Sequence, residues 1–533
     1  MRLKRLAPLF ATAGLLSTSV PLVSATQASA APADGYLNQK ISWQRCESDE
    51  PTPDSFECAA LKVPLDYKNP GGATIDLAIS RLKSANPDKR RGVLLVNPGG
   101  PGAAGVEQPL VLGKQGLPKE VQDQYDLIGV DPRGVGKSSP ITCGLTTREE
   151  RDSGRPYRPE TFDSDVAWAK AFADKCKQNA GAQLPYITTR NTARDMDTVR
   201  ALLGEEKISY LGASYGTYLG AVYSQMFPDR TDRFVLDSGV DPARAWRGMQ
   251  QAWATEAGPA FDRWTKWVAE RNAEFGLGDS PQAVSDTFWQ LVERAEREPI
   301  DMDFQSWSGA TIRSVIRQQA FTPSPPVAHL LMSLRASADG KPLPPGTDLT
   351  EMKKLLNSVN DGTAAGLSPS AAGDGQPPAD NSDAVYWSVL CGDAQWPSEA
   401  GQYAQDAARY KKAYPLYGDI ASNIKPCAFW DRPAEPAVPM DKEAKVLIVQ
   451  NEWDSQTPLV SGQGLNRALK GSRMVTVAGG QGHVLYPRNN CAAAPVTDYL
   501  TTGSLPAQNM TCTNPAGTAE PESIVPPNGP GRF

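Results

Sequence analysis

Short apolar runs separated by helical patterns recur along most of the chain and predict strands that alternate with helices. Two longer segments, 56–67 and 74–82, alternate apolar and polar positions and predict a pair of edge strands. The other predicted strands are 92–96, 127–130, 208–211, 234–236, 446–450 and 474–477. Strands that alternate with helices build a mostly parallel sheet flanked by helices, which places the chain in the α/β class.

The strand rhythm stops between residues 241 and 439. Tryptophan-rich helical patterns such as 261–268 and 288–292 take its place, and they predict a large, mainly helical cap inserted into the α/β unit. Within the insertion, residues 358–383 are rich in Gly, Ala, Pro, Ser and Asp and predict a loop. Residues 513–533 are rich in Pro and Gly and predict a loosely held tail.

The N-terminus has the pattern of a secretory signal peptide. Arg2, Lys4 and Arg5 precede a largely apolar or small-residue stretch at 6–23, and Ala28-Ser29-Ala30 fits the cleavage rule. We therefore expect a secreted, extracellular protein that carries no membrane span after cleavage. The predicted organisation is a signal peptide (1–30), room for a short pro-segment (31–45), the first part of the α/β core (46–240), the cap (241–439), the second part of the core (440–512) and the tail (513–533).

The chain contains eight cysteines, an even number that fits an oxidising compartment. Sequence alone does not determine how cysteines pair. Their grouping predicts four sequential disulfides, Cys46–Cys58, Cys143–Cys176, Cys391–Cys427 and Cys491–Cys512.

The segment from Gly212 to Gly216 reads Gly-Ala-Ser-Tyr-Gly and lies between a predicted strand and a helical pattern. A G-x-S-x-G sequence in this context places the serine on a sharp strand-to-helix turn, with its hydroxyl exposed at the carboxyl end of the sheet. Ser214 is therefore the candidate nucleophile, and the α/β-hydrolase fold is the predicted architecture.

A serine hydroxyl needs a base to take its proton and an acid to orient that base. The chain has only two histidines. His483 follows a predicted strand in a glycine-rich loop and is the candidate base, whereas His329 lies in an apolar helical stretch typical of a structural residue. Asp454 follows the strand at 446–450 and is the preferred acid, and Asp237 at the end of the strand at 234–236 is the alternative.

The developing oxyanion needs hydrogen-bond donors. A strand at 92–96 runs into a loop of sequence Asn-Pro-Gly-Gly-Pro-Gly at 97–102. By its position, this loop is expected to supply one backbone N–H, from Gly100 or its neighbour Gly99. Tyr215, the residue after the nucleophile, is expected to supply the other.

Charge and motifs exclude other classes of function. The formal net charge of −6 argues against nucleic-acid binding. The sequence Gly134-Val-Gly-Lys-Ser138 ends like a phosphate-binding loop, but Asp131 occupies the position where that motif needs glycine. No H-E-x-x-H or C-x-x-C motif occurs, and we expect neither a metal nor a cofactor.

Several motifs together resemble the secreted bacterial tripeptidyl aminopeptidases, which are prolyl-aminopeptidase-like serine peptidases. The matching segments are 97–102, 131–136, 191–195, 212–220, 391–393 with 396–397, and the loops of Asp454 and His483. The resemblance implies release of tripeptides from a free N-terminus, with Ser214 as nucleophile, Asp454 as acid and His483 as base. Proline iminopeptidases carry an HGGPG loop, whereas Asn97-Pro98 precedes the glycines here. That departure favours the tripeptidyl group and leaves open whether proline is preferred at the cleavage site.

An exopeptidase must recognise the ammonium group of its substrate, and a carboxylate near the nucleophile would do so. Asp393 and Glu452 are the candidates, each close in sequence to a motif position; an ordinary loop carboxylate is the competing interpretation of both. The expected partners are peptides or proteins with a free N-terminus, and the expected state is a monomer that binds neither nucleic acid nor membrane. A secreted esterase or lipase on the same fold is the alternative function, and a non-catalytic binding protein is a third hypothesis.

Overall fold

A computed structural model describes residues 35–47, 51–146, 149, 154–302, 305–321, 323–345, 347–350, 352, 376–488 and 490–514. The predicted signal peptide, much of the predicted loop at 358–383 and nearly all of the predicted tail lie outside these residues. None of the helices in this part of the chain is long and apolar enough to cross a membrane.

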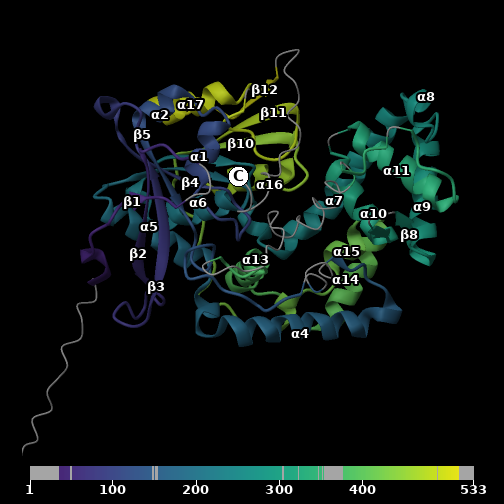
Figure 1. Ribbon diagram of the computed structural model, residues 1–533, viewed down its shortest axis with the longest axis horizontal. Helices are drawn as coiled ribbons and strands as arrows, with labels where there is room; N and C mark the ends of the chain where they lie inside the picture. The colour runs from purple at the N-terminus through teal and green to yellow at the C-terminus, as the bar shows by residue number, and fades with distance from the viewer. Residues whose placement is uncertain are drawn as a thin grey trace, which may run out of the picture.

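One ten-stranded sheet occupies one side of the molecule (Figure 1), in the order β1-β2-β3-β5-β4-β6-β7-β10-β11-β12. The strands are β1 (Gln44–Arg45), β2 (Phe56–Pro64), β3 (Thr74–Leu82), β4 (Gly92–Asn97), β5 (Tyr125–Val130), β6 (Ile208–Ala213), β7 (Thr231–Asp237), β10 (Val446–Trp453), β11 (Arg473–Gln481) and β12 (Met510–Thr513). Strands β5 to β12 in this order pair in parallel, and β1, β2 and β3 pair antiparallel at one edge. The predicted α/β-hydrolase fold is thus confirmed.

Side chains of each central strand point alternately to two hydrophobic layers. Leu94 and Val96 of β4 join one layer, and Val93 and Leu95 join the other. The layer of Leu94 is covered by α1 (Gln108–Lys114), α2 (Lys119–Gln124) and α17 (Ala493–Thr502), and the layer of Val93 by α4 (Phe162–Ala180), α5 (Thr189–Leu202), α6 (Tyr215–Met226) and α16 (Leu459–Ala468). A strand buried on both faces needs a continuous apolar run, which is the pattern that these strands carry.

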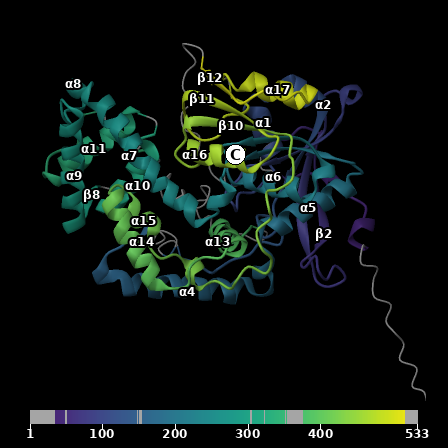
Figure 2. The same cartoon turned by 180° about the vertical axis from the view of Figure 1, so that it is seen from behind.

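The insertion between β7 and β10 is mainly helical, as predicted, and Figure 2 shows its distal helices as a lobe apart from the sheet. Its elements are α7 (Arg247–Ala269), α8 (Asn272–Phe275), α9 (Pro281–Arg297), α10 (Gly309–Gln319), α11 (Pro325–Ala338), α13 (Asn381–Asp393), α14 (Ala400–Ala413), α15 (Gly418–Ser422) and a small sheet of β8 (Ile300–Met302) and β9 (Gln305–Trp307). The helices from α8 to α11 share their own hydrophobic cluster, whereas Val385, Trp387 and Leu390 of α13 belong to the cluster on the central sheet. The insertion therefore has two parts, and α13 packs as part of the core.

The structure differs from the predicted elements in several places, and most of the parallel strands are longer than predicted. Strand β2 ends at Pro64 instead of continuing to residue 67, and the predicted loop at 358–383 ends before α13, which begins at Asn381. The short strands β1, β8, β9 and β12 were not predicted. Strands of two to four residues have too few positions for a period of two to be visible in a sequence.

All eight cysteines pair as predicted, in the disulfides Cys46–Cys58, Cys143–Cys176, Cys391–Cys427 and Cys491–Cys512. Cys391–Cys427 connects the end of α13 to a turn that packs on the same core cluster. The disulfides thus close loops around the sheet.

Candidate active site

Ser214 lies on the sharp turn between β6 and α6. Its backbone has a φ of 56° and a ψ of −122°, a conformation that L-residues rarely adopt. The loop after β4 presses against this turn, because a Cβ atom on Gly99 would lie 2.6 Å from the Ala213 carbonyl oxygen and 3.0 Å from Ser214 Cβ. A strained serine on a tight strand-to-helix turn is the arrangement expected of a nucleophile in this fold.

The side chains of Asp454 and His483 form a hydrogen-bonded pair beyond the ends of β10 and β11. The His483 Nδ1 atom is 2.8 Å from Asp454 Oδ2 and 3.0 Å from Oδ1. The Asp454 carboxylate is fully buried, and the His483 ring is 19% exposed. Asp454 also accepts hydrogen bonds from the amides of Gln456 (2.8 Å) and Thr457 (2.9 Å) and from the Thr457 hydroxyl (2.9 Å). The carboxylate is therefore held in one orientation toward the imidazole.

The surroundings of His483 raise its pKa above the ordinary value of 6.5. Burial alone lowers this pKa, but the charge and hydrogen bond of Asp454, together with the charge of Asp237, more than offset it. A raised pKa makes the imidazole a stronger base, with its Nδ1–H directed at Asp454 and Nε2 left to accept a proton.

Asp237 at the end of β7 connects the serine turn to the histidine loop. Its carbonyl oxygen accepts the Ser214 N–H at 2.9 Å, and its carboxylate accepts the N–H groups of Leu485 (2.9 Å) and Tyr486 (2.8 Å). The neighbouring Ser238 hydroxyl accepts the Val484 N–H at 3.0 Å. Of the two candidate acids, Asp454 thus contacts the imidazole, whereas Asp237 anchors the backbone on both sides of the site.

Burial raises the pKa of Asp237 to about 6, although its hydrogen bonds from Tyr486, Leu485 and Ser238 and the nearby His483 act in the opposite direction. Its side chain lies completely inside the protein. The three N–H and O–H donors around it are the compensation that a buried carboxylate needs.

The loop after β4 carries the predicted backbone donors Gly99 and Gly100. Asn97 Oδ1 accepts the Gly99 N–H at 3.0 Å, so this amide is already used. The Gly100 N–H donates to no acceptor among the described residues. Tyr215 is the first residue of α6, where N–H groups have no acceptor within the helix. The N–H groups of Gly100 and Tyr215 are thus available to donate, whereas that of Gly99 already has an acceptor.

The motif at 131–136 supports this loop through Asp131. Its carboxylate accepts the N–H groups of Gly105 (2.8 Å), Val106 (2.9 Å) and Lys137 (2.9 Å). Two positions later, Arg133 forms a fully buried, bidentate pair with Asp195 of α5, with both N–O distances at 2.7 Å. These motifs shape the loops beside the site and touch no candidate catalytic residue.

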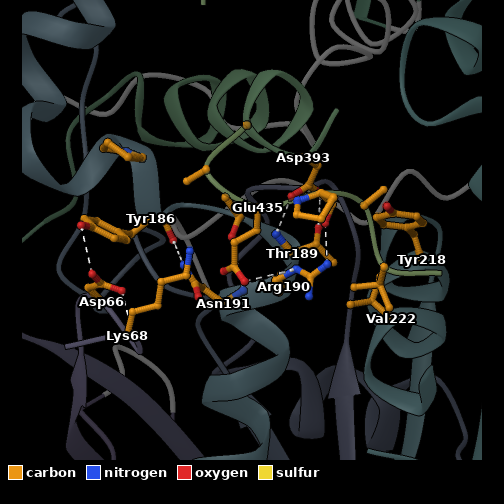
Figure 3. A pocket seen from close by; sticks show the side chains of 17 residues that line it. Asp66, Lys68, Tyr186, Thr189, Arg190, Asn191, Tyr218, Val222, Asp393 and Glu435 are labelled. Carbon is orange, nitrogen blue, oxygen red and sulfur yellow. Dashed lines mark hydrogen bonds and ion pairs between the residues drawn. The ribbon is translucent and has the colours of Figure 1, made fainter. Parts of the chain in front are cut away.

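Asp393 and Glu452, the candidates for binding a substrate ammonium, occupy different surroundings. Glu452 is exposed and accepts the Gly479 N–H at 2.7 Å, beside the histidine loop. Asp393 lies at the end of α13 next to a cavity of about 130 Å³ (Figure 3), and both its oxygens accept hydrogen bonds from Thr189. None of the catalytic candidates lines this cavity. An ammonium-binding role for either residue stays a prediction.

The remaining histidine, His329, lies in α11 of the distal lobe, where its ring contacts Phe275 with 5.6 Å between ring centroids. This packing agrees with the structural role that the sequence predicts for it. Among the described residues, no group of three or more His, Cys, Asp or Glu side chains is arranged to hold a metal ion.

Sequence reasoning missed the supporting residues Asn97, Asp131 and Thr457 as contacts of the site. Thr457 had a visible signal, since it lies three residues after Asp454 in a loop that must turn back toward the base. Asn97 accepts the N–H of the residue two positions later, a local Asx-turn pattern. The contacts of Asp131 with Gly105 and Val106 span 26 and 25 positions, and no local sequence pattern indicates them.

Comparison with known proteins agrees with this geometry. A family model described as "alpha/beta hydrolase fold" matches residues 92–321, and one described as "TAP-like protein" matches residues 414–512. A tripeptidyl aminopeptidase of Streptomyces lividans is 34% identical over 560 residues, which covers 97% of this chain and 99% of that protein. The chain belongs to the tripeptidyl aminopeptidase family.

Two other relatives of this tripeptidyl aminopeptidase family member also carry the names of hydrolytic enzymes. The serine protease Hip1 of Mycobacterium tuberculosis is 30% identical, with 90% of this chain and 92% of that protein covered. A carboxylesterase B of the same organism is also 30% identical, with 94% and 95% covered. The protein is a serine peptidase by its family.

Proposed function

We propose that the protein is a secreted serine exopeptidase that releases tripeptides from the free N-terminus of peptides or proteins. The observation that carries the proposal is the Asp454–His483 pair, which Asp237 connects through backbone hydrogen bonds to the strained turn of Ser214. The names of the Streptomyces relatives support the tripeptide length of the product.

The proposed reaction is acyl transfer through a covalent intermediate. Ser214 Oγ attacks the scissile carbonyl while His483 Nε2 takes its proton, and Asp454 stabilises the imidazolium that forms. The N–H groups of Gly100 and Tyr215 bind the oxyanion. His483 then donates its proton to the leaving amine, and a water molecule activated by the same imidazole hydrolyses the acyl-enzyme.

Secretion is supported by the predicted signal peptide and by the four disulfides. We expect Glu452 to contribute to ammonium recognition, because its exposed carboxylate lies on the loop side of β10 next to the histidine loop. Edman sequencing of protein from the culture medium locates the mature N-terminus. A mature chain that still begins at Met1 would contradict the secretion proposal.

An esterase is the second candidate function, since a carboxylesterase B is among the relatives. The two functions share the acyl-transfer chemistry and differ in the need for a substrate ammonium group. A peptidase of the proposed type cleaves only free-amine peptides, whereas an esterase hydrolyses acyl esters that have no amine.

The test is mass spectrometry of the products from one eight-residue peptide, its N-acetylated form and a matched acyl ester. We expect a tripeptide from the free-amine peptide and none from the acetylated one. Ser214→Ala, which removes the nucleophile, should lower turnover by at least about three orders of magnitude with the fold intact. Cleavage of the acetylated peptide, or hydrolysis of the ester alone, would reject the exopeptidase in favour of an endopeptidase or an esterase. A pair of peptides with Pro or Ala as third residue measures the proline preference.

A further inference from the structure

Tyr215 has two ends that face different parts of the molecule. Its backbone N–H belongs to the first turn of α6 beside Ser214, and its side chain is buried, 3% exposed, against Trp246. The phenol oxygen lies 2.7 Å from Thr189 Oγ1, at the beginning of α5. The contact of the Tyr215 hydroxyl with Thr189 therefore restrains the same residue whose backbone N–H is a proposed oxyanion donor.

Thr189 contacts Asp393 as well as Tyr215. Its hydroxyl lies 2.5 Å from Asp393 Oδ2 and its backbone N–H 2.9 Å from Oδ1, as Figure 3 shows. An ionised carboxylate can only accept hydrogen bonds, so Thr189 donates its single hydroxyl proton to Asp393. The Tyr215 hydroxyl must then donate to Thr189 Oγ1. The three side chains form one directed chain that ends on a negative charge, which strengthens each of its bonds.

The helix that carries Asp393 also contacts the other half of the site. Near the first turn of α13, the Ser382 carbonyl oxygen lies so close to Gly102 that a Cβ atom there would approach it to 2.5 Å. Gly102 has a φ of 104° and follows Gly100 by two residues in the same loop. Asn381, next to Ser382, donates to the carbonyl oxygens of Gly134 (2.8 Å) and Ile141 (2.7 Å). The beginning of α13 thus contacts the loop of Gly100 at Gly102, and its end is hydrogen-bonded to Thr189, which in turn contacts Tyr215.

We propose that α13 holds the two oxyanion-binding amides at a fixed spacing, through the contact of Ser382 with Gly102 and through the hydrogen-bond chain from Asp393 by way of Thr189 to Tyr215. Asp393 and Thr189 are positioning residues in this arrangement. The proposal rests on the oxyanion assignment within the proposed function. It gives the insertion a catalytic task that is separate from covering the site.

The test compares two tyrosines of α6 that share the same aromatic neighbour. Tyr215→Phe removes the hydroxyl that belongs to the chain. Tyr218→Phe is the matched control, because Tyr218 also packs on Trp246, at 4.8 Å between ring centroids, and its hydroxyl bonds to no residue that the structure describes. Thr189→Val breaks the chain at its middle, and Thr189→Ser retains the hydroxyl.

The readouts are kcat, KM and the inhibition constant of a peptide aldehyde, whose adduct with Ser214 places an oxygen in the oxyanion site. The assays run at pH 8, above the pKa of about 6 to which burial raises Asp393. Removal of an oxyanion donor costs about 10²–10³ in kcat. A donor that is displaced but still present should cost less, so we expect about a tenfold loss for Tyr215→Phe and Thr189→Val. KM should change less than about twofold, and aldehyde affinity should fall in parallel with kcat.

Thr189→Ser and Tyr218→Phe should behave as the wild type. The double variant Tyr215→Phe/Thr189→Val should lose no more than either single variant, because both break the same chain. Equal losses for Tyr215→Phe and Tyr218→Phe, or unchanged kcat in both chain variants, would overturn the proposal. If Tyr215→Phe does not fold, the comparison of Thr189→Val with Thr189→Ser decides by the same criteria. A wild-type protein without hydrolytic activity would instead contradict the proposed function itself.

Discussion

Replacement of Asp454 by asparagine is the sharpest test of how the site works. Asp454 Oδ1 accepts the amides of Gln456 and Thr457, so the oxygen of an asparagine will occupy that position. Its NH₂ group then takes the place of Oδ2, which is 2.8 Å from His483 Nδ1 and 2.9 Å from the Thr457 hydroxyl. The NH₂ group donates to Nδ1, so the neutral imidazole must carry its proton on Nε2. In that tautomer His483 cannot accept the proton of Ser214.

The expected loss follows from the tautomer, because the rest of the geometry is retained. An aspartate-to-asparagine change of this kind lowers kcat by about 10⁴ in a Ser-His-Asp triad. That factor corresponds to about 5.5 kcal/mol of transition-state stabilisation. All the backbone donors around Asp454 keep an acceptor, so the melting temperature should remain close to that of the wild type.

Asp237→Asn is the matched control, since Asp237 also lies buried at the end of a neighbouring strand. An asparagine there can keep its oxygen on the amides of Leu485 and Tyr486 and place its NH₂ group toward the Ser238 hydroxyl. The imidazole tautomer does not change, so kcat should fall by less than about tenfold. The assay is steady-state hydrolysis of a tripeptide anilide, with melting curves for both variants.

Two outcomes would refute this reasoning. If Asp454→Asn retains more than about 1% of the wild-type kcat, Asp454 does not set the tautomer of His483. If Asp237→Asn loses as much activity as Asp454→Asn and both remain folded, Asp237 shares the role of the acid.

Two further predictions concern pH. Asp454 and Asp237 raise the pKa of His483 above 6.5, so activity should be lost as pH falls through a value above 6.5. Asp237→Asn should move this acidic limb of the kcat/KM profile to lower pH. An acidic limb at the same pH in the wild type and in Asp237→Asn would contradict the role of the Asp237 charge. Burial raises the pKa of Asp237 from 3.8 to about 6, so its contribution to stability is fully present below pH 3.8 and is lost as pH rises through 6. Urea denaturation measures the difference in the free energy of unfolding between the wild type and Asp237→Asn. This difference should fall by up to about 3 kcal/mol between pH 4 and 7. A difference that does not change with pH would show that the Asp237 carboxyl titrates normally.

Much of the fold was predictable because its signals are local. The buried strands β4, β6 and β10 consist of apolar runs, and a run of this kind has few alternatives to a central position in a parallel sheet. Sequential pairing of the cysteines was also correct, since the two members of each pair lie at most 36 positions apart in the chain. The exact ends of strands and the short strand β12 depend on neighbours far away in sequence and could not be predicted.

The candidate site was predictable at the residues that carry a motif and not at those that support it. Ser214 lies in G-x-S-x-G, and His483 and Asp454 follow strands in the expected order. The sequence favoured Asp454 as the acid but left Asp237 as an alternative, since both end a strand. The structure distinguishes the two residues, because Asp454 contacts the imidazole ring of His483 and Asp237 contacts loop amides.

The sequence by itself determined which chemical groups are present, the strands that carry them and their order along the chain, because these depend on residue type and local periodicity. Only the tertiary structure decided which of those groups meet. The order of strands β6, β7, β10 and β11 brings Ser214, Asp237, Asp454 and His483 to one edge of the sheet. The packing of α13 against the core brings Asp393 to Thr189 across 204 positions of sequence. Such contacts form when apolar surfaces from segments far apart in the sequence are buried together. No local sequence pattern indicates which segments these are.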